Sequence, residues 1–210
     1  MIKILIADDH VIVREGLKQI VAETSDMVVA GEAADSRQTL DLALQQDWDV
    51  VLLDISMPGR GGIDTLKELK HGKPELPVLV LSMYPEEQYA LRALRAGASG
   101  YLTKESAPDE LIGAIRKVAQ NGRYISNSLA EKLAANIGPA TEKPIHELLS
   151  DREYQVMMMI ASGKTVKGIA DELSLSVKTI STNRTRALKK MGMKNNAEFM
   201  YYAIKEGLVK

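Results

Sequence analysis

The chain has 210 residues, of which 45% are hydrophobic, 26% charged and 4% aromatic. This composition is typical of a globular protein with one large domain or two small ones. It excludes a disordered chain, and it excludes a protein that binds single strands by stacking bases on many aromatic side chains. The absence of cysteine excludes disulfides, thiolate metal sites and a cysteine nucleophile.

The formal net charge of −1 hides an uneven distribution. Residues 1–130 carry 14 Lys and Arg against 19 Asp and Glu, a net charge of −5, whereas residues 131–210 carry 13 against 9, a net charge of +4. We therefore expect the two halves to have different partners. No apolar run approaches the ~18 residues of a membrane span, and residues 1–7 lead directly into two acids. We expect a cytoplasmic protein with no signal peptide and no membrane span.

The first half alternates short apolar runs with segments of helical spacing. The apolar runs cover residues 2–7, 27–33, 50–53, 78–81 and 99–102. They are too short for buried helices, and runs of this kind joined by crossover helices are typical of a parallel sheet covered on both faces. We predict five βα units over residues 1–122, in a flavodoxin-like, doubly wound α/β fold with strand order 2-1-3-4-5. Ser36 is expected to cap the second helix.

Charged and polar residues follow these strands, at the edge where such sheets bind ligands. Asp8 and Asp9 follow the first strand, Asp54 the third, Ser82 the fourth and Lys104 the fifth. If the first and third strands are neighbours, three carboxylates share one crevice, and Mg²⁺ can compensate their repulsion. We assign Asp9 and Asp54 to the metal, with Asp8 holding a water. Lys104 and Ser82 complete a site for an aspartyl phosphate on Asp54, because carboxylates can attack phosphorus and the transfer needs mostly positioning and charge neutralisation.

Together with the stretches at 53–59 and 97–102, these residues resemble the receiver domain of bacterial two-component response regulators. The resemblance covers about residues 1–122. It implies that Asp54 takes a phosphoryl group from a sensor histidine kinase, and that Mg²⁺ sits on Asp9, Asp54 and the carbonyl of Ser56. It also implies that Ser82 and Tyr101 form a switch pair.

Each residue of this site also has a structural interpretation when it is taken alone. Asp8 and Asp9 could cap the helix that starts near Val11, Ser82 could make a structural hydrogen bond, and Tyr101 could be a core residue. The occurrence of the whole set at the ends of the strands favours the functional interpretation.

Residues 123–146 are predicted to be a linker that includes a short helix over 128–136, because residues 138–144 combine Gly, Pro and charged residues. Beyond it, residues 147–210 predict a small all-α helix-turn-helix domain. Ser150 and Glu153 form a capping box, so a helix starts at about Asp151. A second helix is expected over 165–173, a third after a turn at 174–176, and a fourth over 198–210. The third helix carries one apolar stripe, made of Val177, Ile180, Ala187, Leu188 and Met191.

The opposite side of the third helix is basic. No Asp or Glu occurs between Glu172 and Glu198, and the phosphates of double-stranded promoter DNA are the natural counterpart of such a face. The candidates for base contacts are Lys178, Ser181, Thr182 and Thr185. The candidates for phosphate contacts are Thr179, Arg184, Arg186, Lys189, Lys190 and Lys194. The alternative is that the basic side of the third helix is simply a solvated charged surface. The turn at 174–176 and the helix caps, which indicate a helix-turn-helix, disfavour this alternative.

The stretches at 149–153, 169–173 and 177–181 resemble the DNA-binding domain of the LuxR type, which implies a dimerising fourth helix. A receiver followed by this domain is the arrangement of NarL/FixJ-family response regulators. The resemblance implies a homodimeric transcription regulator, controlled by phosphorylation of Asp54 and not an enzyme.

Two alternatives remain from the residues themselves. A Mg²⁺-dependent phosphohydrolase would need a second acid two residues after the nucleophile, and Ser56 stands there instead. A DNA-binding dimer whose receiver works without phosphorylation is disfavoured by the complete acidic set with Lys104.

Overall fold

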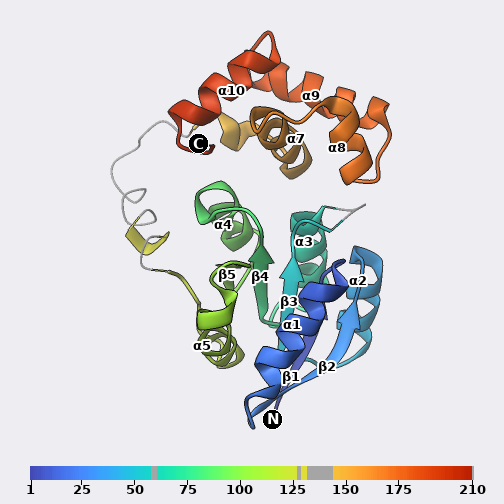
Figure 1. Cartoon of the computed structure of the whole chain (residues 1–210), viewed down its shortest axis with the longest axis vertical. Helices are drawn as coiled ribbons and strands as arrows, with labels where there is room; N and C mark the ends of the chain where they lie inside the picture. Colours follow the sequence, from blue (N-terminus) through green and yellow to red (C-terminus); the bar gives the residue numbers. More distant parts are fainter. Residues whose placement is uncertain (58–60, 127–128, 132–143, 210) are drawn as a thin grey trace. The chain divides into compact units, whose positions relative to one another are not determined.

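The computed structural model describes residues 1–57, 61–126, 129–131 and 144–209. The chain divides into two compact units, residues 1–131 and 132–210, which are described separately (Figure 1). The first unit extends past the predicted boundary at residue 122. Tyr124 forms a parallel bridge with Gly100, and its N–H donates to the Ser99 carbonyl oxygen at 2.9 Å. The segment just beyond residue 122 therefore packs along the edge of the sheet.

The first unit contains a five-stranded parallel sheet of order β2-β1-β3-β4-β5, as predicted. The strands are β1 (Ile2–Ala7), β2 (Met27–Ala33), β3 (Val50–Asp54), β4 (Val78–Ser82) and β5 (Gly100–Thr103). Every residue of β3 and β4 is buried. Neither face of these central strands meets water, which explains their continuous apolar sequence.

Five helices cover the two faces of the sheet. They are α1 (Val11–Ala22), α2 (Ser36–Gln45), α3 (Gly62–Gly72), α4 (Glu86–Arg95) and α5 (Ala107–Ala119). Helices α1 and α5 cover one face, where Leu17 and Leu111 share a core cluster with Ile4, Ile6 and Leu52. Helices α2, α3 and α4 lie on the other face (Figure 1). The helices cover the faces of the sheet, so the carboxyl ends of the strands are the edge at which a site can form.

The predicted cap of α2 is wrong by one residue. Asp35 is the N-cap, and its Oδ1 accepts a hydrogen bond of 2.8 Å from the Gln38 N–H, whereas Ser36 is the first residue of the helix. Asp and Ser are about equally good caps, so the pair offers two starting points. Only the backbone decides between them: Asp35 is extended, with a φ of −153°.

The second unit is helical. It contains a 3₁₀ turn η1 (Ile145–Leu148) and the helices α7 (Asp151–Ala161), α8 (Val166–Glu172), α9 (Val177–Met191) and α10 (Asn196–Lys205). The capping box of Ser150 and Glu153 is present, and α7 starts at Asp151 as predicted. Thr165 caps α8 from outside the helix.

Two details of the prediction for the second unit are wrong. Helix α10 begins two residues earlier than predicted, capped by Asn195, and ends at Lys205 instead of residue 210, because Gly207 adopts a left-handed φ of 68°. Val177 belongs to the predicted apolar stripe but is 50% exposed, since it is the first residue of α9. The other four residues of the stripe are buried.

The predicted helix over 128–136 and the predicted linker fall mostly outside the described residues; only 129–131 of that helix are described, and they are helical. In the part of the chain that the structure describes, no helix combines the length and the apolar character needed to cross a membrane.

Candidate functional site

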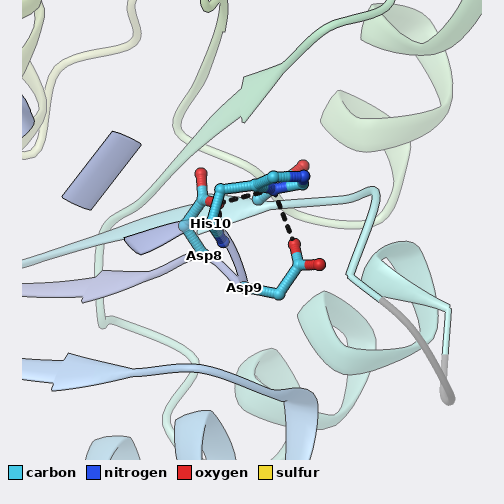
Figure 2. A group of neighbouring side chains, drawn as sticks. Asp8, Asp9 and His10 are labelled. Carbon is cyan, nitrogen blue, oxygen red and sulfur yellow. Dashed lines mark hydrogen bonds and ion pairs between the residues drawn. The ribbon is translucent and has the colours of Figure 1, made fainter. Parts of the chain in front are cut away.

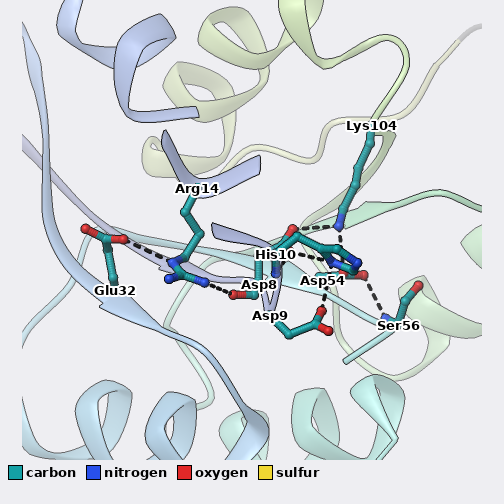
Figure 3. A network of polar contacts seen from close by, with 8 residues as sticks. All are labelled: Asp8, Asp9, His10, Arg14, Glu32, Asp54, Ser56 and Lys104. Atoms are coloured by element: carbon teal, nitrogen blue, oxygen red, sulfur yellow. Dashed lines mark hydrogen bonds and ion pairs between the residues drawn. The ribbon is translucent and has the colours of Figure 1, made fainter. Parts of the chain in front are cut away.

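The ends of β1, β3 and β5 bring Asp8, Asp54 and Lys104 together (Figure 3). The Lys104 Nζ atom lies 2.6 Å from Asp8 Oδ2 and 2.6 Å from Asp54 Oδ2. Its backbone N–H donates to the Ser82 carbonyl oxygen at 2.8 Å, which continues the pairing of β4 with β5 and fixes where the side chain starts. Both carboxylates are almost fully buried. One ammonium group therefore bridges two carboxylates.

Burial and charge oppose each other at this site. Burial raises the pKa of Asp54, although the Lys104 ammonium partly offsets this effect. For Lys104, burial alone would lower the pKa, but the Asp54 and Asp8 carboxylates outweigh it and raise the pKa above its ordinary value. Lys104 therefore keeps its charge and serves as the fixed counter-charge of the acid pair.

Asp9 and His10 complete the acidic cluster (Figure 2). His10 Nδ1 lies 3.0 Å from Asp9 Oδ1 and 3.3 Å from Asp8 Oδ1. The N-cap of α1 is His10, whose side chain makes no capping hydrogen bond, so neither acid is the N-cap itself. Asp8 Oδ1 still accepts a hydrogen bond of 2.8 Å from the His10 N–H at the start of the helix. The His10 side chain is 62% exposed, yet its ring belongs to the cluster. Its position next to the acid pair in the sequence was the only signal of this role.

The cluster is consistent with a metal site. One ligand atom from each of Asp8, Asp9, His10 and Asp54 lies within 4.8 Å of all the others. The buried Oδ1 atom of Asp9 receives no hydrogen bond from the described residues. Carboxylate oxygens are the ligands that hard divalent cations prefer. The residues present therefore fit a cation of this class.

The predicted switch residues converge on the backbone of Tyr84, just after β4. The Ser82 Oγ atom accepts a hydrogen bond of 3.0 Å from the Tyr84 N–H, and the Tyr101 hydroxyl donates to the Tyr84 carbonyl oxygen at 2.8 Å. Ser82 and Tyr101 are both fully buried. On the other side of the site, the Ser56 N–H donates to Asp54 Oδ1 at 2.7 Å. The segment after β4 is thus bound to both predicted switch residues.

Most of the residues predicted to contact DNA lie on one exposed side of α9. Lys178, Thr179, Thr182, Thr185, Arg186 and Lys189 are exposed, as is Lys194 just beyond the helix, whereas Ser181 is partly buried. The Thr182 hydroxyl donates to the Lys178 carbonyl oxygen at 2.8 Å, and the Thr185 hydroxyl donates to the Ser181 carbonyl oxygen at 2.9 Å.

Two of the cations predicted to contact phosphates also bind protein groups. Lys190 Nζ lies 2.6 Å from Oε2 of the buried Glu153, and Arg184 Nε donates to Asn196 Oδ1 at 2.5 Å. Burial raises the pKa of Glu153, but Lys190 and the other donors outweigh burial, so the pKa lies below its ordinary value. These contacts fasten α9 to α7 and α10. No local sequence pattern predicts these contacts, because the partners are 37 and 12 residues apart in the chain.

Comparison with known proteins agrees with this geometry. Residues 4–116 match the response regulator receiver domain, and residues 147–203 match the family described as bacterial regulatory proteins, luxR family. The response regulator GacA of Pseudomonas aeruginosa is 37% identical over 210 residues, covering 100% of this chain and 98% of that protein. This chain is a response regulator.

Solved structures of related response regulators show the same two-part chain. RcsB from Salmonella enterica, bound to the promoter rprA in the presence of the phosphomimetic BeF₃⁻, has a TM-score of 0.67 at 29% identity, over 96% of this chain and 97% of that one. A structure of two RcsB dimers bound to two parallel DNAs has a TM-score of 0.59 at 29% identity, over 97% and 98% of the two chains. The arrangement is that of the NarL/FixJ family, whose members are transcription regulators rather than enzymes. This excludes the phosphohydrolase alternative.

Proposed function

We propose that Asp54 accepts a phosphoryl group from a sensor histidine kinase, and that this modification controls dimerisation and binding to promoter DNA. The observation that carries the proposal is the bridge from Lys104 to Asp8 and Asp54, with Nζ 2.6 Å from each carboxylate. A buried acid beside a fixed cation and two further acids is suited to phosphoryl transfer, which depends on positioning and charge neutralisation.

Mg²⁺ is the proposed cofactor. Asp9, Asp54 and the carbonyl of Ser56 would hold the ion, and Asp8 would hold it through a water. When bound, the ion supplies positive charge beside the attacking carboxylate and the incoming phosphoryl oxygens. Lys104 supplies the second positive charge from the opposite end of the site, since it follows the last strand of the sheet.

Ser82 and Tyr101 are the proposed switch pair. A phosphoryl group on Asp54 brings three acceptor oxygens and about −1.5 to −2 charge. The Ser82 hydroxyl would turn to donate to one of these oxygens, and the Tyr84 N–H would then lose its acceptor. Because Tyr101 binds the carbonyl of Tyr84, the segment after β4 and the Tyr101 side chain would move together.

The basic face of α9 is the proposed DNA contact. Lys178, Ser181, Thr182 and Thr185 would meet base edges. Thr179, Arg184, Arg186, Lys189, Lys190 and Lys194 would face phosphates, and among them Arg184 and Lys190 act mainly by holding α9 in place. The two threonine hydroxyls donate to the helix backbone. Their oxygens can therefore accept from the amino groups of adenine or cytosine, and their methyl groups can contact that of thymine.

The protein is proposed to act in the cytoplasm as a homodimer, as the RcsB dimers on DNA suggest. A two-fold dimer of helix-turn-helix domains predicts half-sites about 10 bp apart, or a multiple of that spacing.

Phosphate incorporation from acetyl phosphate tests the proposal. With Mg²⁺, the wild-type protein is expected to gain one stable phosphoryl group, and D54N none. Chelation of the metal with EDTA should abolish the labelling. A wild-type protein that takes up no phosphate from acetyl phosphate or from any histidine kinase would favour the alternative in which the receiver works without phosphorylation.

A further inference from the structure

The backbone of Asp8 is held at two atoms by groups that the phosphorylation chemistry does not use. The Asp8 N–H donates to the Ala33 carbonyl oxygen at 3.1 Å, which extends the pairing of β1 with β2. The Asp8 carbonyl oxygen accepts a hydrogen bond of 2.7 Å from Arg14 Nη1 (Figure 3). A side chain of α1 is therefore bound directly to the turn that carries two of the acids.

Arg14 is itself held in place. Its Nε atom lies 3.0 Å from Glu32 Oε2, and only 13% of its side chain is exposed. Glu32 stands on β2 opposite Ile6 of β1, and its other oxygen lies 2.8 Å from Lys18 Nζ. Lys18 and, to a lesser degree, Arg14 hold the pKa of Glu32 below its ordinary value, so the carboxylate stays charged. A guanidinium has donors in several fixed directions, and one Arg14 side chain can therefore bind Glu32 and Asp8 together.

The contact with Asp8 affects the next residue. A peptide group is planar, so the direction of the Asp8 carbonyl fixes the plane of the peptide that joins Asp8 to Asp9. That plane sets where Asp9 lies relative to Asp54, whose carboxylate shares the cluster within 4.8 Å. A rotation of this peptide would move the Asp9 carboxylate while the Asp8 N–H stayed on β2.

We infer that Arg14 is a positioning residue for the divalent cation, because it holds the Asp8–Asp9 peptide in the orientation that presents the Asp9 carboxylate to the ion. The inference rests on the proposed metal site. Arg14 contacts neither the ion nor the phosphoryl group. Groups that orient metal ligands in this way typically change metal affinity by about 10- to 100-fold.

The chain offers a matched control in Lys18. R14M and K18M each remove a cation of α1 that binds Glu32, but only Arg14 reaches Asp8. R14K keeps the positive charge and loses the fork that binds in two directions. The affinity for Mn²⁺ is measured on the full chain by the EPR signal of the free ion, and Mg²⁺ is then measured by competition. Thermal unfolding without metal is recorded for each variant.

R14M is expected to raise the Kd for Mn²⁺ and Mg²⁺ by about 10- to 100-fold, with R14K in between and K18M within about twofold of wild type. Equal affinities for R14M and wild type would overturn the inference, and so would equal weakening by R14M and K18M, which would indicate a general effect of charge or stability. If R14M does not fold, R14K against K18M decides in the same way. A wild-type protein that binds neither ion would contradict the proposed metal site itself, and the inference with it.

Discussion

At the scale of single residues, Lys104 balances the negative charge of the acidic site. Its Nζ atom lies 2.6 Å from both Asp8 and Asp54, and 8% of its side chain is exposed. Removing the cation that two buried carboxylates share is expected to lower stability, since removing one partner of a buried ion pair typically costs about 3–5 kcal/mol. Lys104 therefore has a structural role in addition to its proposed contact with the phosphoryl group.

K104M tests this structural role. In the presence of EDTA, the variant is expected to lower the free energy of unfolding by about 3 kcal/mol, because Asp8 and Asp54 lose their counter-charge. The double variant K104M/D54N should recover much of the loss, since one of the two negative charges is then gone. Fluorescence of Trp48, the single tryptophan of the chain, follows urea unfolding of the first unit. A K104M protein as stable as wild type would show that Lys104 carries no structural role.

At the scale of the helices and strands, the sequence predicted most of the fold. The strands of the sheet could be predicted because β3 and β4 are buried at every residue and therefore apolar throughout. The start of α7 could be predicted because Ser150 and Glu153 form a local capping box. The end of α10 at Lys205 depends on the left-handed backbone of Gly207. A glycine permits this conformation but does not require it, so the sequence alone does not predict where the helix ends.

The site was predicted less completely, because only some of its contacts follow from local sequence patterns and the strand order. Asp8, Asp9, Asp54 and Lys104 follow strands, so the topology of the sheet alone brings them to one edge. The contacts of Arg14 with Glu32 and of Lys190 with Glu153 join side chains from different elements. They depend on how helices pack, which a hydrophobic pattern does not specify.

Two neighbouring lysines of α9 make different contacts and are expected to have different roles. Lys189 is exposed on the basic face, whereas Lys190 binds the buried Glu153. K189M is expected to weaken DNA binding and to reduce the slope of log K against log salt by about 0.9, the value of one phosphate contact. K190M is expected to change this slope little and to destabilise the second unit by about 1–2 kcal/mol, because Glu153 loses its cation.

The two lysine variants are compared on a duplex that the wild-type protein selects from a random pool, with salt titrations for affinity. Hydrogen exchange of the amides in α7 and α9 measures local stability. Equal salt slopes and equal exchange in the two variants would contradict the distinction between them.

At the scale of the whole molecule, the charges of the two halves limit how phosphorylation can act. Residues 1–130 carry a net charge of −5 and residues 131–210 a net charge of +4. A phosphoryl group adds about −1.5 to −2 elementary charges to the first half. Added negative charge does not strengthen electrostatic binding to the phosphates of DNA. Dimerisation can do so, because two linked DNA-binding domains raise each other's effective concentration at the second half-site.

DNA affinity with and without a phosphoryl mimic therefore tests the central claim most directly. The full chain and D54N are titrated onto the selected duplex, with Mg²⁺ alone and with Mg²⁺ plus BeF₃⁻. The wild-type protein is expected to bind about 5- to 150-fold more tightly with BeF₃⁻, the usual range of coupling between two sites, and to bind as a dimer. D54N is expected to bind equally in both conditions. Equal affinity of the wild-type protein in both conditions would contradict control by phosphorylation of Asp54.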